Sequence, residues 1–422
     1  MMHLKARGII SALLLSVIAP SAGLAVDSAS IVNSYAQTNF VANKTKYRPT
    51  LGVEKKFING WGISIRPKGA GGHFWVTAKD VSYEYVGDVA ASDKMQLRTL
   101  HQDELKTVAL PVGGDDKFAT GTVFSGSTDQ FIITQQVKGV PPITAPAKFI
   151  FASDGGIISA WTERKKPDGT FDRAGEALSV IDESAEGAQF FGLAISHDFT
   201  QLYAADFGAT PQIRSYDGDF RPARVTFDTP FDTNKNGRVD AGEYAPFNIQ
   251  ALTTPEGKNH LFVTYAKTQP CPKAEIKKGS CKAGELFVGE EDTSKPGLGR
   301  LAEFTQDGAL VAVWNDGGKL SAPWGVAFAP ANFGALSNQL LVSNFGDGTI
   351  AAFNPETRQF VDVMRGKNGK PVAIDKIWGI LFGNGESLGD ANALYFAAGP
   401  RDETDGIFGS LRAVSAAASV GK

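Results

Sequence analysis

Short apolar stretches separated by turns repeat along the chain from about residue 59. Each unit has one apolar stretch, a turn, and then two apolar stretches joined by a second turn, which is typical of a strand followed by a β-hairpin. The leading stretches lie 59, 71, 56, 77 and 54 residues apart, measured between their centres at Gly62, Gly121, Gly192, Asn248, Gly325 and Gly379. Because these strands are apolar on both faces, we expect them to be buried on both sides.

The spacing of the units indicates a repeat architecture. A period near 55–60 residues with four short strands per unit is typical of propeller blades, and the hairpins of the units begin at residues 74, 149, 202, 261, 340 and 394. Six units predict an all-β chain folded as a six-bladed β-propeller. The longest spacing falls in the fourth unit, which therefore carries an insertion.

The last unit ends near residue 414 with only three recognisable strands. The apolar segment at residues 35–41, ahead of the first unit, is a suitable fourth strand. Pairing it into the last blade would close the ring and remove two open sheet edges. We therefore expect residues 26–422 to form a single propeller domain, with two stacked β domains as the alternative.

The first 25 residues have the pattern of a secretory signal peptide. Lys5 and Arg7 precede an apolar run at residues 9–18, and small residues follow at 23–25. The run is short for a membrane-spanning helix, although an uncleaved anchor is the alternative. We expect an exported protein, periplasmic or extracellular, with no transmembrane segment.

Composition narrows the choice of partners. Forty-two basic and 45 acidic residues give a net charge of −3, without a long block of one sign. Nucleic-acid binders carry a basic patch, so we expect no nucleic-acid partner. The 42% hydrophobic content is sufficient for a large core, and we expect a monomer.

Several phrases occur in the order found in one family. They include Asn-Gly-Trp-Gly-Ile-Ser at residues 59–64 and Asn-Phe-Gly-Asp-Gly-Thr-Ile at 344–350, with others at 149–152, 244–250, 321–334 and 394–400. In these phrases the chain resembles an uncharacterised, conserved-hypothetical family of exported bacterial β-propellers. The resemblance implies an NHL-like six-bladed propeller, and it implies no activity, substrate or catalytic residue.

Residues 232–243, here the calcium loop, match the twelve-residue EF-hand-like pattern. Oxygen-bearing side chains stand at positions 1, 3, 5, 9 and 12, and Gly237 stands at the sixth position, where the loop turns sharply. The alternative is a solvated polar turn that binds no ion. The predicted calcium ligands are Asp232, Asn234, Asn236, the Arg238 carbonyl, Asp240 and Glu243.

The flanks of the calcium loop exclude a paired EF-hand. Residues 225–231 are extended and contain Pro230, and residues 244–247 lead directly into a strand. Without two helices to open, a calmodulin-like switch is not expected. We expect a single weak site, with a dissociation constant of roughly 10⁻⁴–10⁻³ M, whose calcium stabilises the fold.

The two cysteines, Cys271 and Cys281, lie ten residues apart in one loop, residues 270–282. Export permits a disulfide, so we expect them to form one, with two free thiols or a metal pair as alternatives. The surrounding charged residues, Glu290 and Glu291 among them, are interpreted as a solvated insertion, or else as a partner-binding lobe.

Propeller topology brings the loops between strands 2 and 3, and those between blades, to one rim. We expect this rim to be the functional face, binding a small molecule, a glycan or a protein. Its aromatic strand starts and acidic turns could instead be inner-layer packing and turn formers. The ligand-binding candidates are Asn59, Trp61, Asn248, Trp324, Asp347, Trp378, Asp402 and Glu403.

Two functions are consistent with these features. The first is an exported, calcium-binding module for an unknown ligand, and the second is a secreted hydrolase or lyase, lactonase- or esterase-like, that uses acids on the rim. Scattered histidines argue against a zinc lyase, and no nucleophile elbow or phosphate loop is present, so the catalytic residues stay unassigned. A central pocket with converging carboxylates would favour the enzyme, and a shallow aromatic rim would favour the binding module.

Overall fold

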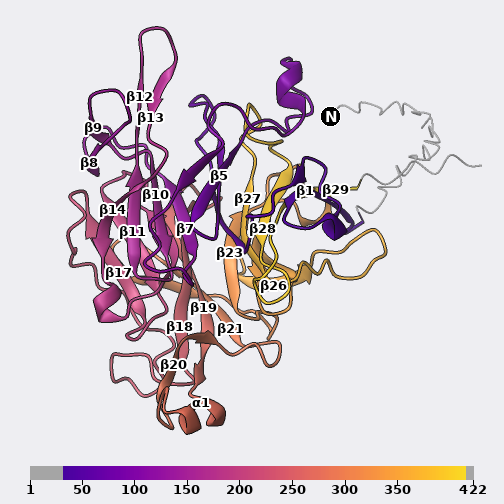
Figure 1. Cartoon of the computed structure of the whole chain (residues 1–422). Helices are drawn as coiled ribbons and strands as arrows, with labels where there is room; N and C mark the ends of the chain where they lie inside the picture. Colours follow the sequence, from indigo (N-terminus) through magenta and orange to yellow (C-terminus); the bar gives the residue numbers. More distant parts are fainter. Residues whose placement is uncertain (1–31, 415–422) are drawn as a thin grey trace, which may run out of the picture. The chain divides into compact units, whose positions relative to one another are not determined.

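The computed structural model describes residues 32–414, which are almost entirely β-structure. Their strands form six larger sheets, arranged as the blades of a β-propeller, and two two-stranded hairpins (Figure 1). The predicted fold class is confirmed. The predicted signal peptide at residues 1–25 lies outside the described residues. Within the described part, no helix has the length and apolar character needed to cross a membrane.

The innermost strand of each blade contains the predicted centre of its unit. Neighbouring inner strands contact one another around the ring, and the sixth contacts the first. Glycine is needed for this close approach, because a Cβ on Gly121 would lie 2.6 Å from the Leu193 amide nitrogen of the next blade. In order, the inner strands are β3 (Gly60–Ser64), β7 (Ala119–Phe124), β15 (Phe190–Ile195), β18 (Tyr244–Thr253), β23 (Pro323–Phe328) and β27 (Ile377–Phe382).

The outer strands of each blade follow as antiparallel neighbours. Blades 1 and 2 add β4 (Phe74–Ala78), β5 (Val81–Tyr85) and β6 (Thr107–Ala109), then β10 (Phe149–Ser153), β11 (Ile157–Trp161) and β14 (Leu178–Asp182). Blades 3 and 4 add β16 (Gln201–Asp206) and β17 (Gln212–Asp217), then β19 (Asn259–Pro270), β21 (Gly299–Phe304) and β22 (Leu310–Val313). Blade 5 adds β24 (Leu340–Asn344), β25 (Ile350–Asn354) and β26 (Gln359–Val363).

Blade 3 departs from the expected four strands. Its sheet contains only β15, β16 and β17. After β17 the chain turns back at Pro222, which bridges to Tyr216, and then runs through a proline-containing segment into the calcium loop. Proline lacks the amide hydrogen that a ladder needs, so this connection does not add a regular strand.

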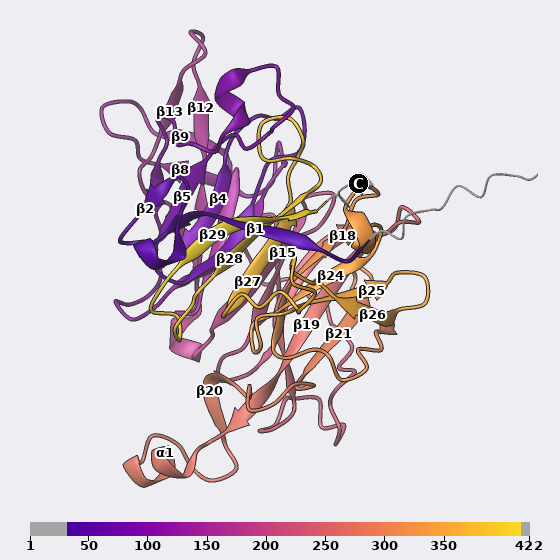
Figure 2. The same ribbon diagram turned by 90° about the vertical axis from the view of Figure 1, so that its right-hand side faces the viewer.

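The N-terminal strand completes blade 6, as expected. In this blade β27 is followed by β28 (Ala393–Ala398), β29 (Ile407–Ala413) and β1 (Tyr35–Ala42). Strand β1 pairs antiparallel with β29, with Tyr35 opposite Ala413 (Figure 2). The buried Tyr35 hydroxyl also donates a 2.7 Å hydrogen bond to the Phe333 carbonyl of blade 5. The ring is thus closed by two ends of the chain.

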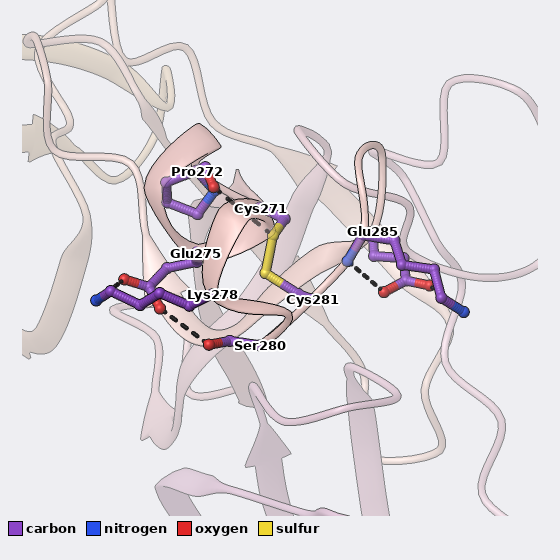
Figure 3. The surroundings of a disulfide bond; sticks show 8 residues. Cys271, Pro272, Glu275, Lys278, Ser280, Cys281 and Glu285 are labelled. Atoms are coloured by element: carbon purple, nitrogen blue, oxygen red, sulfur yellow. Dashed lines mark hydrogen bonds and ion pairs between the residues drawn. A yellow bond between two sulfur atoms is a disulfide. The ribbon is translucent and has the colours of Figure 1, made fainter.

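Blade 4 carries the predicted insertion between β19 and β21. It contains α1 (Lys273–Lys278) and β20 (Leu286–Glu291), which pairs with the extended end of β19 and projects with α1 from the blade in both views (Figures 1 and 2). A disulfide joins Cys271 to Cys281, whose Cα atoms are 6.0 Å apart (Figure 3). The predicted disulfide is confirmed. Ser280 and Lys278 both hydrogen-bond to Glu275, so the loop is closed by polar contacts as well.

One short strand and two hairpins lie beside the regular blade strands. Strand β2 (Gly52–Val53) pairs parallel with β1, and two hairpins project from blade 2. The hairpins are β8 (Ile132–Gln135) with β9 (Ile143–Pro146), and β12 (Glu163–Lys165) with β13 (Phe171–Arg173).

Candidate functional site

A cavity of about 470 Å³ opens where the inner strands begin. We call it the axial mouth, and every blade contributes to its lining. The inner strands β3, β15 and β27 and the turn after β24 supply its aromatic floor, while segments between blades and between strands 2 and 3 supply its polar walls. The lining includes Trp61, Lys117, Asp154, Gln189, Phe191, Glu290, Glu291, Phe345, Lys376, Trp378, Asp402 and Glu403.

The floor of the mouth is a packed aromatic cluster. Trp61 and Trp378 stack with ring centroids 3.8 Å apart and planes 16° apart. Phe345 lies 4.0 Å from Trp378, and Phe191 meets the edge of Trp61 at 5.4 Å. These side chains are at most 5% exposed. They therefore close the propeller axis below the cavity as well as forming its floor.

Asn59 connects the floor to the wall. Its side-chain oxygen accepts a 2.8 Å hydrogen bond from the Trp378 indole nitrogen, and its amide nitrogen donates a 2.8 Å bond to Glu403. Asn59 is fully buried and has a left-handed backbone with φ of 50°. Asparagine tolerates this conformation better than most residues. Its one side-chain amide therefore joins Trp378 of the floor to Glu403 of the wall.

The turn that carries Glu403 is strained. Arg401, Asp402 and Glu403 have φ values of 60°, 47° and 61°, so three successive non-glycine residues are left-handed. Such a conformation costs on the order of 1–3 kcal/mol per residue and persists where surrounding contacts hold it. Here the Arg401 amide donates a 2.9 Å hydrogen bond to Asp375, which precedes the sixth inner strand. The turn places Glu403 in the wall of the mouth.

Burial raises the pKa of four mouth carboxyl groups, those of Asp154, Glu290, Glu291 and Glu403. It raises the pKa of Glu403 to about 7, although the hydrogen bond from Asn59 opposes the shift. It raises the pKa of Glu291 to about 8, with repulsion from Glu403 adding to the effect. It raises the pKa of Asp154 to about 6, opposed by a 2.6 Å hydrogen bond from the Phe118 amide. The mouth thus contains carboxyl groups that change charge near neutral pH.

Lys376 supplies a positive charge beside these groups. Its ammonium nitrogen lies 4.0 Å from the centre of the Phe345 ring. Its attraction lowers the pKa values of Glu290, Glu291 and Glu403, against the larger effect of burial. Lys376 also has a left-handed backbone, with φ of 52°.

The structure separates the predicted ligand-binding residues into three places. Trp61, Trp378, Asp402 and Glu403 lie together in the axial mouth, and Asn59 adjoins them. Asn248 and Trp324 line a second cavity of about 250 Å³ deeper along the inner strands, where the Asn248 amide donates a 2.8 Å hydrogen bond to the Trp324 carbonyl. Asp347 is exposed on a turn and accepts a 3.0 Å hydrogen bond from the Thr349 amide.

Five charged residues of the mouth are not among the predicted ligand-binding residues: Lys117, Asp154, Glu290, Glu291 and Lys376. Of these, Glu290 and Glu291 belong to the segment interpreted as a solvated insertion or a partner-binding lobe. In the structure, the base of the insertion reaches the mouth, where Gly289 lies against Gln189 of the loop before blade 3. In the sequence, the adjacent acids Glu290 and Glu291 near the end of the insertion were the feature that could have indicated this site.

The calcium loop is a separate, largely exposed feature between blades 3 and 4. The Asp232 carboxylate accepts 2.7 Å hydrogen bonds from the amides of Lys235 and Gly237. Glu243, at the far end of the loop, accepts 3.0 Å bonds from the amides of Thr233 and Asp240. The two ends of the loop are therefore held together, with Gly237 at the turn (φ of 78°).

The central side chains of the loop bond to each other. Asn234 and Asn236 donate amide hydrogen bonds of 2.7 and 2.8 Å to Asp240, and Arg238 forms a 3.2 Å ion pair with it. The oxygen donors are of the hard type that calcium prefers, so the residues fit the ion chemically. Within residues 32–414, however, no three His, Cys, Asp or Glu side chains gather as a metal-binding group. The calcium assignment stays a prediction.

Comparisons with known proteins assign no activity to the chain. No family model matches the chain. Two uncharacterised proteins of Acanthamoeba polyphaga mimivirus are each 25% identical to it, over 386 and 361 residues, which cover 90% and 84% of this chain and 80% of each relative. The exported bacterial family of the sequence resemblance, and its NHL-like character, stay expectations.

Similar solved structures are distant. The soluble aldose sugar dehydrogenase of Escherichia coli has a TM-score of 0.44 at 11% identity, covering 90% of this chain and all of that one. A protein of unknown function from Bacteroides thetaiotaomicron has a TM-score of 0.44 at 8% identity, covering 85% of this chain and 70% of that one.

Proposed function

We propose that the protein is a binding module that holds a small polar ligand in the axial mouth. The supporting observation is the combination of a rigid aromatic floor with ionisable groups that converge from several blades on one cavity. Ligand sites commonly join apolar stacking surfaces to a few placed polar groups. The predicted rim candidates Trp61, Trp378, Asp402 and Glu403 take part in this site, with Asn59 orienting Glu403.

A thermal-shift screen of small polyols, amines, carboxylates, lactones and esters would test this function, with hits measured by calorimetry. The informative variant is Glu403→Gln, which removes a charge from the wall and keeps the shape. Asp347→Asn is the matched control, since it changes an exposed acid outside the mouth. We expect only Glu403→Gln to weaken binding, by about tenfold. Equal effects of the two variants would overturn the proposal.

A hydrolase or lyase is the second candidate. It is supported by the raised pKa values of Asp154 and Glu403, because a carboxyl group that titrates near neutrality can serve as a general acid or base. The same lactones and esters, followed for turnover, distinguish the candidates. Turnover that is lost in Glu403→Gln and kept in Asp347→Asn would favour the enzyme.

Calcium, in this proposal, stabilises the connection between blades 3 and 4. The ligands would be Asp232, Asn234, Asn236, the Arg238 carbonyl, Asp240 and Glu243. Next to the loop, Phe231 packs edge-on against Tyr265 of β19 with centroids 4.8 Å apart, so an ordered loop would hold this contact. The ion would raise the stability of the fold and would not take part in ligand binding in the mouth.

Export is also part of the proposal. The Cys271–Cys281 disulfide supports it, because structural disulfides persist mainly in oxidising compartments. Cell fractionation and mass spectrometry of the mature N-terminus would test it. A chain that keeps residues 1–25 and stays in the cytoplasm would contradict it.

A further inference from the structure

The charges around the axial mouth are unequal. Two lysines, Lys117 and Lys376, face five carboxyl groups, which gives a formal charge of 2 − 5 = −3 when all are ionised. The acids are Asp154, Glu290, Glu291, Asp402 and Glu403. A ligand carrying a positive charge would reduce their mutual repulsion, and an anion would increase it.

The floor already holds one cation. The ammonium group of Lys376 lies over the Phe345 ring, 4.0 Å from its centre, and Lys376 lines the same cavity as Glu290, Glu291 and Glu403. An aromatic face next to carboxylates is a common arrangement for binding organic cations, since the ring face and the acids both attract positive charge. Lys376 thus occupies the kind of environment that an amine ligand would require.

A second observation points to a ligand with a hydrogen-bond acceptor. Trp61 lines the mouth and is 3% exposed, yet its indole nitrogen has no hydrogen-bond partner among the described residues. Its stacking partner Trp378 does have one, the Asn59 oxygen at 2.8 Å. A buried donor without a partner costs about 1–3 kcal/mol, which an acceptor on a ligand would recover.

We infer that the axial mouth binds a small organic cation, a primary amine or quaternary ammonium compound that also carries a hydroxyl or carbonyl oxygen. This inference rests on the proposed binding function and specifies its ligand class. The cationic group lies over the aromatic floor beside Glu403 and Glu291, and the oxygen accepts the hydrogen bond from Trp61. A bare metal ion would not use the aromatic floor.

Calorimetry with a matched pair of probes tests the charge. Choline carries a quaternary ammonium group and a hydroxyl, and 3,3-dimethyl-1-butanol is its neutral isostere. At pH 8.5 we expect choline or ethanolamine to bind, and choline to bind about tenfold tighter than the isostere. Equal binding of the isostere would overturn the inference.

The pH dependence gives a second readout. The titratable groups facing the ligand are Lys117, Asp154, Glu290, Glu291, Lys376, Asp402 and Glu403. Affinity for choline is expected to rise between pH 6 and about pH 8, as Glu403 and Glu291 lose their protons, and then to level off. Affinity that is independent of pH would contradict the assigned position of the cation.

Lys376→Ala separates this ligand class from a neutral sugar. Removing the Lys376 ammonium group uncovers the aromatic floor and takes away the positive charge beside the acids. Choline is therefore expected to bind at least about threefold tighter to this variant. A sugar that needs Lys376 as a donor would bind more weakly in the same variant. Lys319→Ala is the matched control, since Lys319 is exposed and lies 6.0 Å from the Phe360 ring, outside the mouth. Thermal unfolding of both variants checks that they fold.

The outcomes distinguish the ligand class from the binding function. If glucose or other neutral polyols bind with an affinity that Glu403→Gln reduces, while the amines do not bind, then the cation inference fails and the binding function holds. If neither the amines nor the polyols bind at 10 mM, both fail.

Discussion

The axial mouth and the calcium loop both contain acidic side chains, but the pKa values of three mouth acids and of Asp240 in the loop are shifted in opposite directions. In the mouth, burial raises the pKa values of Asp154, Glu291 and Glu403. In the loop, hydrogen bonds from Asn234 and Asn236 lower the pKa of Asp240. The mouth acids come from three blades, whereas the loop acids come from twelve consecutive residues.

The loop carboxylates are therefore already stabilised by hydrogen bonds, whereas the mouth acids are destabilised in their charged form. The loop carboxylates already accept hydrogen bonds from the loop backbone, so a cation gains little beyond them and the expected affinity is weak. The mouth acids are crowded and partly desolvated, so a complementary ligand would relieve repulsion. The four predictions below test this comparison, in order of decreasing effect.

Replacing Trp378 with alanine should destabilise the protein most. The side chain is 1% exposed and packs against Trp61 and Phe345, so its removal should cost about 3–5 kcal/mol of unfolding free energy in denaturant titrations. Val361→Ala, at a half-exposed residue of β26, is the control and should cost under about 1 kcal/mol. A cost for Trp378→Ala as small as the control would contradict the rigid floor.

Calcium should stabilise the wild-type protein through the loop alone. With a dissociation constant of roughly 10⁻⁴–10⁻³ M, 10 mM calcium is expected to add about 1–3 kcal/mol, seen as a higher melting temperature. Glu243→Gln should abolish this gain and Glu403→Gln should keep it. A calcium effect lost in Glu403→Gln would place the ion in the mouth instead.

The two regions should respond to pH with opposite sign. The folded protein holds a proton on Glu291 up to about pH 8, whereas the unfolded chain releases it near the ordinary value of 4.5, so this group favours folding at low pH and the benefit is lost as the pH rises toward 8. Glu291→Gln should therefore be more stable than wild type at pH 9, by about 1–2 kcal/mol.

The loop provides the contrast for this experiment. The pKa of Asp240 is lowered, so its contribution is present above its unfolded pKa and lost as the pH falls through the lower folded value. Asp240→Asn should reduce stability at pH 7 and have no effect at the lowest pH that the fold tolerates. Melting curves from pH 3 to 9 measure both variants, and parallel pH profiles would contradict the comparison.

Removing the disulfide should have the smallest global effect. Cys271→Ser with Cys281→Ser frees an insertion that projects from blade 4, so global unfolding should change by about 1 kcal/mol or less, while amide exchange in residues 270–291 accelerates. Ligand affinity in the mouth should fall about twofold because Glu290 and Glu291 become less fixed. Unchanged exchange rates in the insertion would contradict this interpretation.

The comparison also explains what could be predicted from sequence. The blade period and the strand at residues 35–41 follow from local apolar patterns. The calcium pattern and the cysteine pair each lie within one short segment of the sequence. These features could therefore be recognised without the structure. The mouth depends on residues up to 342 positions apart, such as Trp61 and Glu403, which only the closed ring brings together. Blade 3 has three strands because a proline-containing segment follows Pro222 in place of a fourth strand. The regular spacing of the units gave no indication of this difference.

The most direct test is calorimetric titration of the best ligand from the screen into three proteins at 10 mM calcium: wild type, Glu403→Gln and Asp232→Asn. The account predicts that Glu403→Gln binds at least about tenfold more weakly and that Asp232→Asn binds within about twofold of wild type. Binding that is lost in Asp232→Asn and kept in Glu403→Gln would contradict the assignment of the axial mouth as the functional site.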